Sequence, residues 1–187
     1  LTLTGMMLTG LVLAREWERG TMEAMMATPV SPLAFLISKT VPYFGLGMTG
    51  WGLCLAAAVF LYDVPVRGSL TIVAASSVLY LLMGLGLGLF ISGKTRSQFL
   101  ASQVTVLAGF LPAVILSGFI FDLRSAPAWA NVIAHLFPPV YYMELLRVGF
   151  LTGGMESLVI RDFAVLTGFA AVFLFLAYRM CAKRIRR

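Results

Sequence analysis

The sequence predicts an all-α protein, a polytopic transmembrane helical bundle, and three observations support this fold class. The composition is 60% hydrophobic and only 12% charged, whereas soluble domains carry about 25% charged residues. Three charge-free runs, residues 40–62, 68–93 and 97–121, each exceed the roughly 20 residues that a helix needs to span a bilayer. The basic residues behind the net charge of +6 cluster at the ends of apolar runs and in the tail. That is the pattern of membrane topology rather than of a nucleic-acid-binding face.

Four complete spans are expected, separated by short polar turns. An earlier apolar run, residues 1–14, is too short for a comfortable span, so we expect it to be the end of a helix and the chain to be a fragment. Pro42 should bend its span or mark the true start of that span, and Pro112 should kink the span that contains it. The complete spans are expected at residues 40–62, 68–92, 99–121 and 162–179.

The longest stretch that cannot lie in lipid is residues 15–39. It carries five charges within nine residues, and charges at the bilayer centre are costly, so this stretch must face water. The five are Arg15, Glu16, Glu18, Arg19 and Glu23. A short helix at residues 32–38 is expected after the start signal Ser31-Pro32. It would lie at the membrane surface, with Lys39 at the headgroups.

Another short helix is expected earlier in this loop. Gly20 disfavours helix just before this segment, Thr21 can cap the first turn of the short helix, and Pro29 ends that helix. Three methionines at spacing i, i+3, i+4 form one apolar stripe on it; these are Met22, Met25 and Met26. Such a stripe either packs against its own protein or docks into another, since methionine adapts to many shapes. The residues alone leave both interpretations open.

Small and polar residues inside the spans predict helix packing. Gly84 and Gly88 have the small-xxx-small spacing that lets two helices approach closely. A phosphate-binding loop is the alternative, but the run lacks GxGxxG and GxxxxGK[ST] and lies mid-span. The first turns of the expected span at residues 99–121 are unusually polar, with Gln98, Ser102, Gln103 and Thr105. Such residues mostly join helices, and lining a pathway is the alternative.

Residues 122–154 are apolar but interrupted by prolines. We expect one half-helix at residues 127–137 and a second at residues 140–151, joined at a proline break. The interrupting prolines are Pro127, Pro138 and Pro139. This arrangement predicts a re-entrant hairpin, which is tolerated where protein or water covers its turn. Glu144 and Arg147 are spaced i, i+3 and can pair.

Charge counting predicts the orientation. If residues 15–39 lie inside, ten basic residues fall inside and four outside, which obeys the positive-inside rule. The basic tail is then cytoplasmic. Residues 122–154 must also enter and leave on the outer face, because a full crossing would place the tail outside.

The sequence carries no pattern for catalysis, for a cofactor or for a metal. His135 is the single histidine, and no cysteine or carboxylate stands near it at ligand spacing. An intramembrane serine protease built on Ser117 and His135 would lack a complete nucleophile motif. No nucleotide-binding signature is present, so any ATP must be hydrolysed by a partner.

One extended pattern resembles a known family. Glu16-x-Glu18-x-Gly20-Thr21-x-Glu23, followed by Thr28-Pro29-Val30-Ser31 and Lys39, resembles the cytoplasmic coupling loop of ABC transporter permeases with the ABC type-2 transmembrane domain. The resemblance continues through RSQFLASQ at residues 96–103, LSGFIFDL at residues 116–123 and Pro138-Pro139-x-Tyr141-Tyr142. It covers nearly all 187 residues, with an earlier span and any outer domain missing. The pattern is most similar to bacterial exporters of the multidrug-efflux kind.

The resemblance implies a multi-pass permease subunit of an ATP-binding-cassette exporter in the bacterial cytoplasmic (inner) membrane, with a cytoplasmic C-terminus. It implies an ATPase subunit as partner, a second permease copy or paralogue, contact with membrane lipid, no nucleic acid and no cofactor. The cargo would be drug-like, lipid-like or otherwise amphipathic. ATPase coupling would fall to Arg15, Glu16, Glu18, Arg19, Gly20, Thr21, Met22, Glu23, Met25, Met26, Thr28 and Pro29. The outer gate hairpin would use Pro138, Pro139, Tyr141, Tyr142, Glu144 and Arg147.

Two other functions stay open from the residues. A channel would need a pore ring of charged or carbonyl groups, and the spans carry almost no charge. A non-transporting membrane scaffold would not need the coupling pattern.

Overall fold

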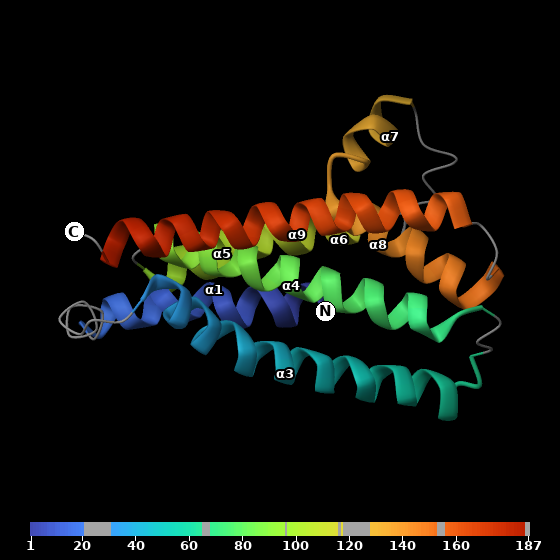
Figure 1. Cartoon of the computed structure of the whole chain (residues 1–187), viewed down its shortest axis with the longest axis horizontal. Coiled ribbons are helices and arrows are strands. Elements are labelled where there is room, and N and C mark those ends of the chain that lie inside the picture. Colours follow the sequence, from blue (N-terminus) through green and yellow to red (C-terminus); the bar gives the residue numbers. More distant parts are fainter. Residues whose placement is uncertain are drawn as a thin grey trace.

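Long helices running side by side make up most of the structure, a computed structural model that describes residues 1–20, 31–64, 68–95, 97–115, 117, 128–152 and 156–185 (Figure 1). Every regular element among these residues is helical, and the described part of the chain contains no β-strand. Four of the described helices are long and apolar enough to cross a membrane. The predicted all-α transmembrane bundle is therefore confirmed.

Helix α4, Leu70–Lys94, forms the centre of the bundle. Helices α1, Thr2–Glu18, and α9, Glu156–Ile185, pack along it, and α3, Pro32–Phe60, and α8, Pro138–Arg147, also touch it. Among the candidate spans α4 is the most buried and α3 the least. The many small residues of α4 explain its position, because they let neighbouring backbones approach closely.

The glycines of α4 face two different neighbours. A methyl group added at Gly88 would overlap Oγ1 of Thr9 on α1, and one added at Gly86 would lie 2.9 Å from the α9 backbone. At Gly84 the same methyl group would meet Met6 at an ordinary 3.6 Å. Helix α4 is therefore wedged between α1 and α9, and α1 comes too close at Gly88 for any side chain.

The expectation of a separate surface helix at residues 32–38 is wrong. That segment and most of the expected span 40–62 form one uninterrupted helix, α3. Its start is as predicted, because Ser31 is the N-cap and its Oγ accepts a hydrogen bond from a first-turn N–H at 3.2 Å. Pro42 removes one backbone hydrogen bond without ending the helix. A break there would leave several more backbone groups unpaired, which is costly in an apolar segment.

The next span changes helical type midway. Helix α5, Gln98–Thr105, continues through a π-helical turn, η1, Val106–Phe110, into α6, Leu111–Ile115. Pro112 lies just after this π turn, which widens the helix where the proline lacks an N–H. A local change of helix type thus stands where the sequence predicted a kink. The expected end of the span at residue 121 lies outside the described residues.

Two short helices precede α9: α7, Ala128–Ala134, and α8, which continues into a π turn, η3, Val148–Thr152. Figure 1 shows α7 standing out from the bundle, while α8 packs against α4 and α9. The expectation that the second helix begins at residue 140 is wrong. Pro138 and Pro139 are its first two residues, because the first turn of a helix does not use the N–H that proline lacks.

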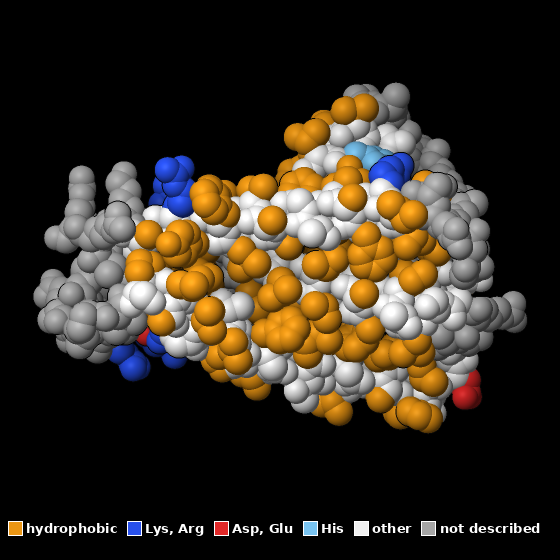
Figure 2. All heavy atoms as spheres, viewed as in Figure 1, with side chains coloured by type: hydrophobic (Ala, Val, Ile, Leu, Met, Phe, Trp, Pro, Cys, Tyr) orange, Lys and Arg blue, Asp and Glu red, His pale blue; other side chains and the backbone are white. Residues whose placement is uncertain are grey.

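The two ends of the bundle carry different side chains. The end of α9, the last turn of α1 and the start of α3 lie at one end, where Lys and Arg side chains gather (Figures 1 and 2). We call it the basic end; its described basic residues are Arg15, Arg19, Lys39, Lys94 and Arg179. The opposite end carries Asp63, Glu144, Arg147, Arg161 and Asp162.

Candidate functional site

The last turn of α1 gathers four charged side chains at the basic end. Helical spacing places Arg15 and Arg19 one turn apart on one face, with Glu16 and Glu18 on either side of it. Gly20 follows with a φ of +69°, a left-handed conformation that ends the helix. The two carboxylates therefore point toward different neighbouring helices.

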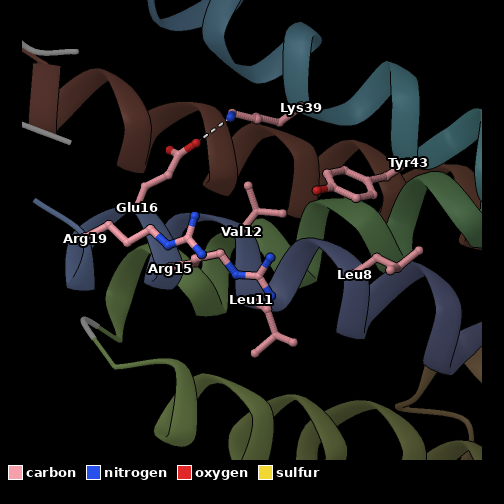
Figure 3. Close-up of a pocket in the computed structure, with 8 residues that line it drawn as sticks. All are labelled: Leu8, Leu11, Val12, Arg15, Glu16, Arg19, Lys39 and Tyr43. Carbon is pink, nitrogen blue, oxygen red and sulfur yellow. Dashed lines mark hydrogen bonds and ion pairs between the residues drawn. The ribbon is translucent and has the colours of Figure 1, made fainter. Parts of the chain in front are cut away.

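Glu16 joins α1 to α3. Its Oε1 forms an ion pair with Nζ of Lys39, and the two side chains are only 17% and 27% exposed (Figure 3). The ammonium group of Lys39 also lies 5.7 Å from the ring centre of Phe35. Partial burial makes this pair stronger than a fully solvated one, because water screens it less.

Glu18 joins α1 to the start of α5. One carboxylate oxygen accepts a hydrogen bond of 2.7 Å from the backbone N–H of Gln98, and the other accepts one from the Gln98 side-chain amide. Gln98 is the first residue of α5, so the negative charge sits at the positive end of that helix. The backbone hydrogen bond, followed by the side-chain one, holds the pKa of Glu18 below its ordinary value. Arg15 adds a donor 3.4 Å from the Gln98 amide oxygen.

The end of α1 is thus fastened to two other helices by two side chains that are two residues apart. Glu16 connects this helix end to α3, and Glu18 connects it to α5. The arrangement can transmit a mechanical shift between helices, and it contains no nucleophile or acid–base pair positioned for a reaction.

The rest of the predicted coupling segment lies outside the described residues. It comprises Thr21, Met22, Glu23, Met25, Met26, Thr28 and Pro29. The whole of residues 21–30 joins the end of α1 to the start of α3, so both of its attachment points belong to the site described above.

The predicted gate residues lie at the opposite end, on α8. Glu144 contacts Nη2 of Arg161 at 3.0 Å and Nε2 of His135 at 3.7 Å, while Arg161 also contacts Asp162 at 2.8 Å. Burial, followed by the neighbouring Asp162, raises the pKa of the Glu144 carboxyl. These contacts tie α8 to α9 and to the end of α7. The predicted pairing of Glu144 with Arg147 stays a prediction.

The two tyrosines of α8 join different elements. The ring of Tyr142 stacks on Tyr80 of α4 with 4.3 Å between the ring centres, and its hydroxyl lies 2.9 Å from Oγ of Ser77. The hydroxyl of Tyr141 donates to the carbonyl oxygen of His135 at 2.8 Å. Pro138 and Pro139, both buried, start the helix that carries these tyrosines.

Sequence reasoning missed Arg161, Asp162 and the contacts of His135, and it gave Gln98 only a general role in joining helices. The charged pair at residues 161–162 stands at the start of an apolar run, and that signal marks a polar anchor. The partner of Glu18 could not be read from spacing, because 80 residues separate the two. No cluster of His, Cys, Asp and Glu in the described ranges is arranged to hold a metal ion.

Comparison with known proteins gives one consistent result. A family model described as ABC-2 family transporter protein matches residues 1–179. The chain is 42% identical over 185 residues to the probable multidrug ABC transporter permease YbhS of Escherichia coli (strain K12), covering 99% of this chain and 49% of that protein. It is 26% identical over 184 residues to the probable multidrug ABC transporter permease YbhR of the same strain, covering 98% and 50%.

A eukaryotic relative is more distant. The ABC transporter G family member 20 of Dictyostelium discoideum is 24% identical over 146 residues, covering 78% of this chain and 20% of that protein. The chain spans about half the length of the bacterial relatives it matches. No solved structure matches the chain.

Proposed function

Because the chain belongs to the ABC-2 family of transporter proteins, we propose that it acts as the membrane-spanning permease subunit of an ATP-binding-cassette exporter, driven by ATP hydrolysis in a separate subunit. The observation that carries this proposal is the double attachment of the end of α1, through Glu16 to α3 and through Glu18 to α5. A segment fastened in this way can act as a lever. Its relatives include proteins whose printed names describe multidrug ABC transporter permeases.

In this proposal residues 15–29 dock on the ATPase subunit. Closure of the ATPase around ATP displaces the segment, and the two attachments pass the displacement on to α3 and α5. The transporter then exchanges inward- and outward-facing states, because ATP binding favours one of them by its differential affinity. A second permease copy or paralogue completes the pathway, and the cargo is drug-like, lipid-like or otherwise amphipathic.

The proposal also fixes an orientation. The basic end faces the cytoplasm, following the positive-inside rule, with the C-terminus on the same side. The hairpin of residues 122–154 then lies at the outer face, where α8 acts as a gate. The protein is an integral membrane protein of the bacterial inner membrane.

The decisive experiment separates coupling from assembly. The full-length permease and its ATPase are reconstituted in vesicles, with Glu18→Lys and Glu23→Lys introduced together, and with Gly20→Pro as a second variant. Gly20 has a positive φ that proline cannot adopt, so the variant redirects the segment. We expect ATP hydrolysis to continue while transport falls by about tenfold or more, which corresponds to roughly 1.4 kcal/mol of lost coupling.

The matched control is Asp63→Asn, which removes a charge from an exposed residue at the opposite end of the bundle. It should leave both ATP hydrolysis and transport unchanged. If the loop variants transport at the normal rate, or if the intact permease never co-purifies with an ATPase, the coupling role is wrong.

Orientation is tested by labelling a single thiol introduced at position 19 in intact cells, after replacing the native cysteines. A membrane-impermeant reagent should fail to reach it until the inner membrane is opened. Labelling from the outer side would place the end of α1 outside the cell, where no ATP is available, and would contradict the coupling role.

A further inference from the structure

A groove lies between α1 and α3 at the basic end, next to the attachment made by Glu16 (Figure 3). Its volume is about 350 Å³, within the range of roughly 300–1,000 Å³ that small-molecule sites occupy. It is lined by Leu8, Leu11, Val12, Arg15, Glu16, Arg19, Lys39 and Tyr43. The predicted coupling role accounts for some of its charges but not for its apolar wall.

Helical spacing divides the groove into two parts. On α1 an apolar stripe, Leu8 and Val12, continues one turn later into Arg15 and then Arg19 (Figure 3). On α3 Lys39 and Tyr43 repeat the same order, one turn apart, from the charged end toward the apolar part. The groove therefore has a basic mouth at the end of the bundle and an apolar floor that runs along the spans.

Positive charge dominates the mouth. Three cationic side chains, Arg15, Arg19 and Lys39, line the groove together with a single carboxylate, Glu16, which forms an ion pair with Lys39. Both arginines are exposed, and the Nε of Arg15 is directed to Gln98 on the far side of the helix end. The excess charge at the mouth favours an anion, and guanidinium groups match the oxygens of a phosphate.

The basic mouth and the apolar floor together fit an amphipathic ligand that has an anionic group and an apolar chain. A free phosphate would use the arginines but would gain nothing from Leu8 and Val12. An uncharged acyl chain would use the floor but not the mouth. An anionic phospholipid uses both, and basic pockets between transmembrane helices bind such headgroups. Tyr43 suits the same boundary, since its ring is apolar and its hydroxyl polar.

We propose that the α1–α3 groove is a binding site for an anionic phospholipid, with its phosphate between Arg15 and Arg19 and an acyl chain along Leu8 and Val12. The binding itself does not depend on the proposed transport function. If that function also holds, a lipid seated here touches Glu16 and Lys39, so the anionic lipid content of the membrane would adjust the coupling between α1 and α3.

The test measures lipid retention on the purified full-length permease, without its ATPase. The protein is exchanged into nanodiscs of phosphatidylcholine containing a small fraction of phosphatidylglycerol, and bound lipid is counted by native mass spectrometry. We expect preferential retention of phosphatidylglycerol. Val12→Trp fills the apolar part of the groove and keeps every charge. Arg15→Gln with Arg19→Gln removes two positive charges from the mouth and keeps the apolar floor. Each should reduce retention by about tenfold or more. The two Arg→Gln changes remove charge-assisted hydrogen bonds to the phosphate, and Val12→Trp occupies the space of the acyl chain.

The matched control is Leu53→Trp, which places the same bulk on a 68%-exposed position of α3 away from the groove. It should retain lipid normally, and all variants must elute as folded protein. Normal retention by the folded Val12→Trp variant would overturn the proposal.

Two further arms separate the sources of binding. Excess inorganic phosphate should not release the lipid, because it cannot replace the acyl chain; full release would reduce the site to an anion site and overturn the proposal. The other occupant to consider is the segment of residues 21–30. Efficient cross-linking between cysteines introduced at Leu8 and Met25 in the lipid-loaded protein would mean that the segment fills the groove, which excludes a lipid there.

Discussion

The contact between α1 and α4 and the polar links that the end of α1 makes with α3 and α5 are built in opposite ways. Along α4 the short side chains bring two backbones together: Oγ1 of buried Thr9 donates to the Leu85 carbonyl at 3.2 Å, and Gly88 leaves no room for a methyl group. Toward α3 and α5 the links are long, flexible side chains, Glu16 and Glu18, at the helix end.

This difference indicates which parts move together. Two backbones in direct contact cannot slide without a clash, because a packed seam has few alternative arrangements. Long side chains can keep an ion pair or hydrogen bond while their helices tilt. We therefore expect α1 and α4 to shift as one body, and α3 to follow through its polar link. Helix α5 is joined to α1 in both ways, through Glu18 and through the close contact of Gly10 with Thr105.

The largest effect on stability is expected from disrupting the close contact between α1 and α4 at Gly88, which we call the glycine seam. In Gly88→Ala the new methyl group meets Oγ1 of Thr9 and also the Met6 carbonyl oxygen at 2.6 Å, so a side-chain rotation cannot relieve the clash. Overpacking of this kind typically costs about 1–3 kcal/mol. Thermal unfolding of the full-length permease in detergent should show a clear drop in Tm.

Gly84→Ala is the matched control for that change. Its methyl group would meet Cγ of Met6 at 3.6 Å, an ordinary contact. The two glycines share one sequence motif, so equal destabilisation by both substitutions would contradict the seam geometry.

The sequence predicted the spans well because a charged residue in lipid is costly wherever its tertiary partners lie, so a span must be a continuous run without charge. Runs free of charge identified most of α3, α4 and the span from α5 to α6 without knowledge of any partner. It predicted the surface helix before Lys39 wrongly, because Lys39 was taken as the boundary between two helices, whereas α3 continues through it. The prolines at residues 138–139 were read as a break, although helix starts accept proline equally well.

The links of the candidate site could be predicted only in part. The charges at residues 15–19 were found because they stand between apolar runs, yet their partners depend on how helices pack. Glu18 and Gln98 are 80 residues apart, and no local period relates them. Helical spacing offered Arg147 as a candidate partner of Glu144, but the contact of Glu144 with Arg161 depends on the placement of α8 on α9. Tertiary packing supplies this information and spacing does not.

A smaller effect is expected at the α1–α3 link. Glu16→Lys and Lys39→Glu should each lower the free energy of unfolding of the full-length permease. The charge-swapped double variant should recover part of that loss. For a half-buried pair the coupling energy is about 1 kcal/mol or less. A double-mutant cycle on unfolding free energies measures it. Losses that simply add, with no recovery in the swap, would mean that the ion pair contributes nothing.

The smallest effect concerns the α1–α5 link and depends on pH. The pKa of Glu18 is lowered below the ordinary value of 4.5, chiefly by the backbone hydrogen bond from Gln98. A lowered pKa in the folded state means that the stabilisation is complete at neutral pH and disappears as the pH falls through that lowered value. Glu18→Gln keeps an acceptor oxygen but removes the charge at the start of α5, so its Tm should lie slightly below that of the unchanged protein at pH 7. The two Tm values should converge once the pH lies below that lowered pKa. A difference in Tm that persists in acid would assign the effect to packing rather than to the carboxylate. The link between α1 and α5 would then depend on close packing, as the contact between α1 and α4 does.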